Sequence, residues 1–170
     1  MHIMKTSLWV AAVAALFFTP AIAASVSYTV SSGGKPVLAL KLPAGCEART
    51  KGDKTIIADW HQRPKFEFEL WVVENRKTVN EVVERIGDII KSEFQNIKVN
   101  KTDTIRIADV QASKISGAGA EADDGDPGKT QVVVFSIGGP VFVACVHGEG
   151  DYASRHLRAM LDVLDSAQKP

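Results

Sequence analysis

Between Gln131 and His147 almost every position is apolar, and β-branched or aromatic residues predominate. Gly138-Gly139-Pro140 divides this stretch into two runs, which predicts a β-hairpin. Each run is apolar on both sides. In the first run Val133, Phe135 and Ile137 point away from Val132 and Val134, and in the second Val141, Val143 and Cys145 point away from Phe142, Ala144 and Val146. Strands that are apolar on both faces are typical of the centre of a sheet that is covered on both sides.

Four segments before residue 75 are also typical of strands. They are Ser25–Val30, Val37–Leu42, Thr55–Trp60 and Lys65–Val73. In the last of these, apolar residues alternate with Glu67 and Glu69, which predicts a face more exposed than either face of the hairpin. The segment from Gly45 to Asp53 is polar and is predicted to be a connection.

The hydrophobic period then changes from strand to helix. Between Thr78 and Phe94 the apolar residues recur at the i, i+3, i+4, i+7 spacing of one helix face. Thr78 and Glu81 form a capping-box sequence at its start. Gly87 weakens a helix, and close packing of the helix on the sheet would be a reason for a glycine there.

The remaining elements are predicted as strands Ile97–Ile107 and Val110–Ala118, a loop from Gly117 to Lys129, the hairpin, and a last helix from Tyr152 to Asp165 that is capped by Asp151. This order predicts an α+β fold, in which an antiparallel sheet of about six or seven strands is covered by two main helices in an α/β/α sandwich.

The first residues are typical of a secretory signal peptide. Lys5 precedes an apolar run from Leu8 to Phe18, and Ala21-Ile22-Ala23 provides a small-x-small cleavage pattern. We therefore expect residues 1–23 to be removed, leaving residues 24–170 as a single periplasmic or secreted domain. Removal of Lys5 leaves 19 Lys and Arg against 20 Asp and Glu. This balance indicates no nucleic-acid partner, and no later stretch is long enough to span a membrane after signal cleavage.

Cys46 and Cys145 are the two cysteines. In an oxidising compartment such a pair is compatible with a disulfide bond. A free Cys145 would also pack well in a central strand as a small hydrophobic residue. The sequence leaves both alternatives open.

The candidate binding residues are Trp60, His61, Arg63 and Trp71. Trp and Arg are favoured at the centres of protein interfaces, which suggests a surface for another envelope or secreted protein. The alternative is that Trp60 and Trp71 belong to the core.

A metal site is the alternative to a binding surface. His147 ends the hairpin and His156 lies in the last helix, so with Glu149 or Asp151 they are candidates for a His/His/carboxylate zinc site of a hydrolytic enzyme. Asp123, Asp124 and Asp126 resemble the start of a calcium loop, but the later glutamate of that motif is missing, which favours a solvated loop.

Catalytic motifs and cofactor motifs are absent from the sequence. There is no Gly-x-Ser-x-Gly, and Gly138-Gly139-Pro140 lacks the helix that a phosphate-binding loop requires. We therefore expect a non-catalytic binding or accessory domain without a cofactor. A further alternative is a carrier of an apolar ligand, which would need a cavity under Ile86 and Ile90.

The layout resembles the PsbP-like fold. The resemblance is carried by the opening strand that leads into Leu42-Pro43-Ala44-Gly45, the strand Phe66–Val73, the helix Thr78–Phe94, the segment Ile105–Ala112, the hairpin Gln131–Cys145 and the final helix that ends Leu161-Asp162-Val163-Leu164. Photosystem II extrinsic proteins, a eukaryotic Ran-binding nucleotide-release factor and many bacterial secreted proteins share this fold. The resemblance implies an accessory or binding role with an unspecified partner, because the fold hosts diverse functions.

Overall fold

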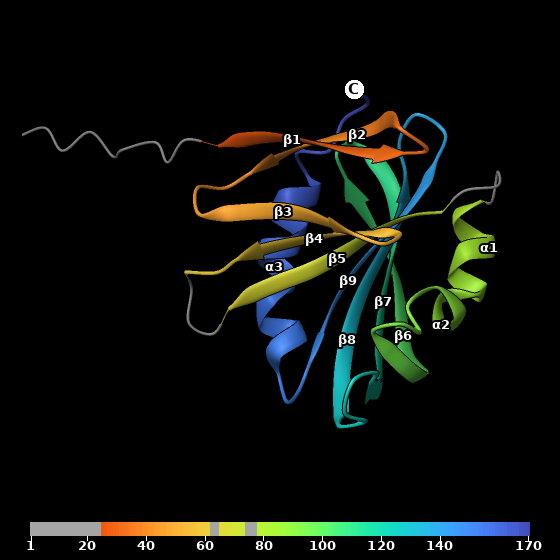
Figure 1. The fold of residues 1–170 in the computed structure, drawn as a ribbon. Helices are drawn as coiled ribbons and strands as arrows, with labels where there is room; N and C mark the ends of the chain where they lie inside the picture. Colours follow the sequence, from red (N-terminus) through yellow and green to blue (C-terminus); the bar gives the residue numbers. More distant parts are fainter. Residues whose placement is uncertain (1–24, 62–64, 74–77) are drawn as a thin grey trace, which may run out of the picture.

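The central hairpin lies in the middle of a seven-stranded antiparallel sheet. The computed structural model describes residues 25–61, 65–73 and 78–170. In this part of the chain the strand order is β3-β4-β5-β9-β8-β7-β6 (Figure 1). The strands are β3 (Cys46–Lys51), β4 (Lys54–Asp59), β5 (Phe66–Val73), β6 (Phe94–Ile107), β7 (Val110–Glu121), β8 (Pro127–Ser136) and β9 (Val141–Gly148).

The hairpin β8–β9 is apolar on both faces, as predicted. Val133, Phe135, Phe142, Ala144 and Val146 belong to one buried cluster, together with Leu38, Leu40, Phe68 and Met160. Val132, Val134, Val143 and Cys145 belong to a second cluster, together with Trp71, Val82, Ile90 and Phe94. The sheet therefore separates two cores.

The first cluster lies between the sheet, helix α3 (Tyr152–Leu164) and a two-stranded ribbon of β1 (Val26–Ser32) and β2 (Lys35–Leu42). Backbone hydrogen bonds between Ala39 and Gln168 join this ribbon to the chain beyond α3. The second cluster lies under two short helices, α1 (Val79–Glu84) and α2 (Ile86–Ile89). Figure 1 shows α3 and the α1–α2 pair on opposite sides of the sheet. The α+β prediction is confirmed.

Two local predictions before residue 95 differ from the structure. The segment Cys46–Lys51 is an edge strand and not a connection. The helix predicted from Thr78 to Phe94 is broken at Arg85, although the capping box of Thr78 and Glu81 is present. Gly87 packs closely, since a Cβ atom there would lie 3.0 Å from the Ile97 side chain. None of the helices in the described part of the chain is long and apolar enough to cross a membrane.

The predicted loop Gly117–Lys129 is mostly strand. Strand β7 extends to Glu121 and β8 begins at Pro127, so only a short turn remains between them. In that turn the backbone N–H of Asp126 donates to Asp124 Oδ1 over 2.9 Å. This longer β7–β8 pair carries Glu121 to the end of the sheet, beside the end of β9.

Candidate functional site

His147 is the centre of a group of charged side chains at the end of the sheet. It follows Cys145 by two residues in β9, so its side chain lies on the face of the second cluster. Its ring packs against Phe94 with 5.8 Å between the ring centroids. The imidazole is mostly buried, with 16% of the side chain exposed.

Two carboxylates bind the two nitrogens of this ring. Nδ1–H donates to Oε2 of Glu121, at the end of β7, over 2.5 Å. Nε2 lies 3.5 Å from Oε2 of Glu69, in the middle of β5. Glu69 is opposite Cys145 in the β5–β9 ladder and is only 4% exposed. The expectation of an exposed face on β5 is therefore wrong at Glu69.

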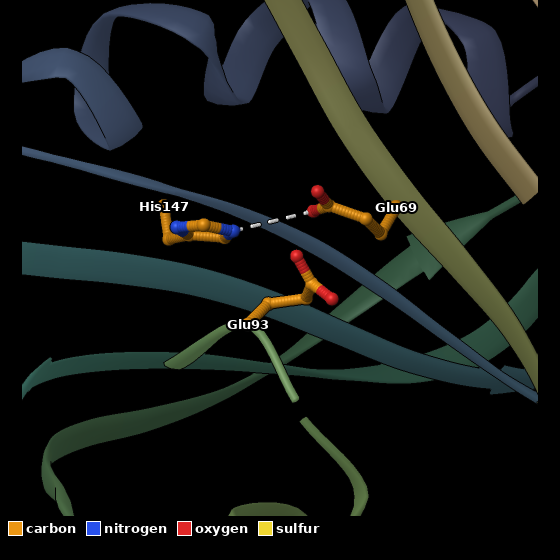
Figure 2. A group of neighbouring side chains, drawn as sticks. All are labelled: Glu69, Glu93 and His147. Atoms are coloured by element: carbon orange, nitrogen blue, oxygen red, sulfur yellow. Dashed lines mark ion pairs between the residues drawn. The ribbon is translucent and has the colours of Figure 1, made fainter. Parts of the chain in front are cut away.

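Glu93 and Lys54 complete the group. Glu93 lies between α2 and β6, and its Oε1 forms an ion pair with the buried ammonium of Lys54 from β4. One donor atom each from Glu69, Glu93 and His147 lies within 4.8 Å of the others. Figure 2 shows the Glu69 and Glu93 carboxylates facing the same side of the His147 ring.

Glycines on β7 and β8 make room for this arrangement. A Cβ atom on Gly128 would lie 2.7 Å from Glu121 Oε1 and 3.0 Å from the Phe94 ring. A Cβ atom on Gly119 would lie 2.6 Å from the same ring. Without side chains at these positions, Phe94 and Glu121 can lie across β8 and reach His147. These glycines are therefore part of the strands for a packing reason.

The charged surroundings keep His147 protonated near neutral pH. Burial alone would lower the pKa of the imidazole, but its interactions with the carboxylates of Glu69 and Glu121 outweigh burial and raise the pKa to about 9. Burial also raises the pKa of Glu121, and Asp123 and Asp124 add to this, although the His147 charge opposes it.

A cleft of about 680 Å³ opens beside this group. It lies between the ends of β5 and β9 and the start of α3. Its lining residues are Lys65, Glu67, Glu69, His147, Gly148, Glu149, Gly150, Asp151, Tyr152 and Arg155. Tyr152 fixes one wall, since its hydroxyl donates to the Lys65 carbonyl over 2.6 Å and accepts from the Glu67 N–H over 3.1 Å.

The predicted binding residues do not form one surface. Trp60 is partly buried and His61 is exposed, both just after β4. Trp71 is buried in the second cluster and pairs with Lys54, at the other end of the β4–β5 ladder. Arg63 lies outside the described residues. Trp60 does contact the cleft wall, because Lys65 Nζ lies 3.5 Å from its ring centroid.

The structure does not bring the predicted metal ligands together. His147 contacts the second cluster through Phe94, whereas His156 packs on Tyr152 and on Phe66 of the first cluster. The sheet separates the two imidazoles. Asp151 is paired with Arg155 on α3 over 2.9 Å, and Glu149 lines the cleft. Of the four residues, only His147 belongs to the group that could hold a metal.

The two cysteines are free thiols. Cys46 packs against the first cluster and Cys145 is buried in the second, so the sheet lies between them and a bridge does not form. Burial raises the pKa of both thiols, and the raised pKa keeps Cys145 protonated. The Cys145 sulfur lies 3.2 Å from Oγ1 of Thr130, which is fully buried.

The apolar-carrier alternative would need a cavity under Ile86 and Ile90, beneath α1 and α2. Ile86 and Ile90 are buried in the second cluster, where they pack among Val82, Phe94 and Trp71.

Sequence reasoning missed Glu69, Glu93, Glu121 and Lys54. Each one looks like an ordinary solvent-facing charge in its own segment. One signal was available for Glu69. The hairpin is apolar on both faces, so the next strand in the sheet must also be covered on both faces, and a carboxylate on it needs a buried partner.

No protein-family model matches the chain, and no curated protein matches it by sequence. Solved structures do match its fold. Cyanobacterial PsbP (CyanoP) from Synechocystis superposes with a TM-score of 0.54 at 13% sequence identity, over 89% of this chain and 96% of that one. The fold is PsbP-like.

Two bacterial proteins share this PsbP-like fold. PA94 from Pseudomonas aeruginosa, a protein of unknown function, has a TM-score of 0.52 at 13% identity, over 84% of this chain and 94% of that one. LpqN from Mycobacterium tuberculosis, described as involved in cell envelope biogenesis, has a TM-score of 0.50 at 13% identity, over 86% of this chain and 91% of that one. At this identity the likeness concerns the fold alone.

Proposed function

We propose that this protein is an exported, non-catalytic PsbP-like domain that binds another envelope or secreted protein at the cleft. The observation that carries the proposal is the cleft itself, a hollow of about 680 Å³ at the end of the sheet with charges of both signs on its walls. Such a surface is suited to a partner segment that presents complementary charges.

The walls of the cleft provide the contacts that an interface needs. Its lining includes the cations of Lys65 and Arg155 and the carboxylates of Glu67, Glu149 and Asp151. The cleft surface continues to Trp60 through Lys65, and the guanidinium carbon of Arg49 lies 5.1 Å from the centroid of the same ring. Trp and Arg are the residue types that most often dominate binding energy.

Export is supported by the sequence before residue 24, where the charged start, the apolar run and the cleavage pattern occur in the order of a signal peptide. The envelope role described for LpqN, which has the same fold, is in keeping with a partner in that compartment. A non-catalytic domain is in keeping with the lack of a nucleophile motif in the sequence.

Two matched arginines test the proposal. Arg155 lines the cleft and pairs with Asp151, whereas Arg158, also on α3, pairs with Asp162 and is not part of the cleft lining. Both pairs are exposed i,i+4 pairs, so reversing either charge costs similar, small stability. The mature chain and the R155E and R158E variants are immobilised and exposed to the native envelope fraction, and captured proteins are identified by mass spectrometry.

We expect the mature chain and R158E to capture the same partner. In a titration with the purified partner, R155E and W60A should bind it at least about ninefold more weakly, which is roughly 1.3 kcal/mol of binding free energy. Equal affinity in R155E and R158E would contradict the cleft as the contact surface.

Export is tested separately, by the N-terminal sequence of the protein in the envelope fraction. This sequence should begin at Ala24, and an intact Met1 start would contradict export.

A further inference from the structure

We infer that Glu69, Glu93 and His147 form a binding site for a divalent transition-metal ion, for which zinc is the probe. The three side chains come from β5, the α2–β6 connection and β9, and each offers a ligand atom within 4.8 Å of the other two. Their donor set is one imidazole nitrogen and two carboxylate oxygens (Figure 2). Zinc accepts both kinds of ligand.

The spacing between His147 and Glu69 suits an ion better than a hydrogen bond. Charge-assisted N–H···O bonds span about 2.7–2.9 Å, but Nε2 and Oε2 are 3.5 Å apart. Two ligands bound at about 2.0–2.1 Å to one tetrahedral ion are separated by roughly 3.3 Å. Glu69 is nearly completely buried, and its carboxylate faces the imidazole of His147 across this long contact. A small movement would place an ion between the two atoms.

Glu121 orients the imidazole for this role. It accepts the Nδ1 proton over 2.5 Å and thereby directs Nε2 toward Glu69. Metal-binding histidines commonly donate their second N–H to a carboxylate, which fixes the ring and makes the ligating nitrogen more basic. Glu121 is therefore a positioning residue that orients the imidazole and does not itself bind the ion.

The charges around the site also favour a cation. Three carboxylates, Glu69, Glu93 and Glu121, surround it, and Lys54 and the imidazolium of His147 are the cations paired with them. When an ion binds, the Nε2 proton of His147 passes to solvent and the nitrogen lone pair coordinates the metal. Lys54 pairs with Oε1 of Glu93, so the second oxygen of that carboxylate is available for the ion.

The cleft gives the ion a way in. Glu69 and His147 are both part of its lining, so the two ligands can be reached from solvent. Three protein ligands leave the fourth position of a tetrahedral ion to water. Calcium is disfavoured because it requires six to eight oxygen ligands. A soft monovalent ion is disfavoured because no thiolate takes part.

The experiment uses the mature chain, residues 24–170, stripped with EDTA and dialysed. Zinc is titrated by calorimetry, and the imidazole nitrogens are followed by NMR of protein labelled with ¹⁵N-histidine. We expect one zinc per chain and a large shift of the His147 Nε2 signal. E69Q and H147Q should weaken zinc binding by at least about tenfold, and E121Q by about 10- to 100-fold.

E149Q and H156Q are the matched controls, because both residues were candidates from the sequence and neither belongs to the group. They should bind zinc as the unaltered chain does. Loss of zinc binding in H156Q with retention in E69Q would overturn the proposed ligand set. If millimolar zinc produced no heat and no change in the His147 NMR signal of the unaltered chain, the site would be overturned. This measurement does not depend on whether the variants fold. Zinc binding requires no protein partner, so it stands or falls separately from the proposed function.

Discussion

Nδ1 of His147 lies 2.5 Å from Oε2 of Glu121, and this contact joins the end of β9 to the end of β7 across the intervening strand β8. The groups that face the imidazole are Glu69 from β5, Glu121 from β7 and Glu93 from the α2–β6 connection, with Lys54 from β4 beside Glu93. The interactions of His147 with Glu69 and with Glu121 couple its protonation to the stability of the fold.

The first prediction concerns the pH dependence of the metal-free protein. The pKa of His147 is raised from 6.5 to about 9 in the folded state, so its stabilising effect is complete below about pH 6.5 and is lost as the pH rises through about 9. A shift of this size corresponds to roughly 3 kcal/mol. Urea denaturation in EDTA should therefore show falling stability across this range, and the H147Q variant should not show the fall. If the free energy of unfolding fell equally steeply with pH in both proteins, groups other than His147 would be responsible for the fall.

The second prediction concerns Gly128. An added methyl group would collide with Glu121 Oε1 and with the Phe94 ring, so G128A should lower the free energy of unfolding by about 1–3 kcal/mol. Because Glu121 is displaced from His147, the pH-dependent fall should also become smaller. K129A, at an exposed neighbour, is the control. Unchanged stability in G128A would mean that the strand can shift to accept the methyl group.

The third prediction compares two helix starts. Thr78 caps α1 through a reciprocal capping box with Glu81, whereas Asp151 precedes α3 without a side-chain capping bond. T78A should therefore cost about 1 kcal/mol of stability, and D151A should cost less because only the exposed pair with Arg155 is lost. Thermal unfolding of the two variants measures the difference. A larger loss in D151A would contradict the assigned role of the capping box.

The fourth prediction concerns the thiols. Cys145 is completely buried and Cys46 is partly exposed, so a thiol reagent should label Cys46 in the folded protein and both cysteines only after unfolding. Mass spectrometry of the protein purified without reductant should give the mass of two free thiols. Detection of an intramolecular bridge would contradict the separation of the two cysteines by the sheet.

The sequence predicted the parts of the fold that depend on local hydrophobic patterns. The two-sided hairpin, the strand Phe66–Val73 and the final helix follow from periodicity, and the structure has them. Strand β3 was missed because it is a polar edge strand in which most side chains face solvent. The long helix was broken at Arg85 because periodicity cannot distinguish one helix from two consecutive short ones.

The charged group was less predictable than the fold. His147 was recognised as a candidate from its place at the end of the hairpin, but its partners were sought nearby in the sequence, at Glu149 and His156. The actual partners, Glu69 and Glu121, are brought to it by strand pairing. Gly119 and Gly128 indicated a loop, although their lack of a side chain is what allows Phe94 and Glu121 to lie over the strands.

The register of the central hairpin has a consequence for the whole site. In β9, Val146 lies in the apolar core under α3 while the next residue, His147, lies among the carboxylates. A slip of one residue would exchange the two, placing a charged ring under α3 and an isopropyl group between Glu69 and Glu121. The turn at Gly138 and Gly139, at the far end of both strands, sets this alignment. A tight turn at the far end of the hairpin thus determines on which face of the sheet the His147 side chain lies.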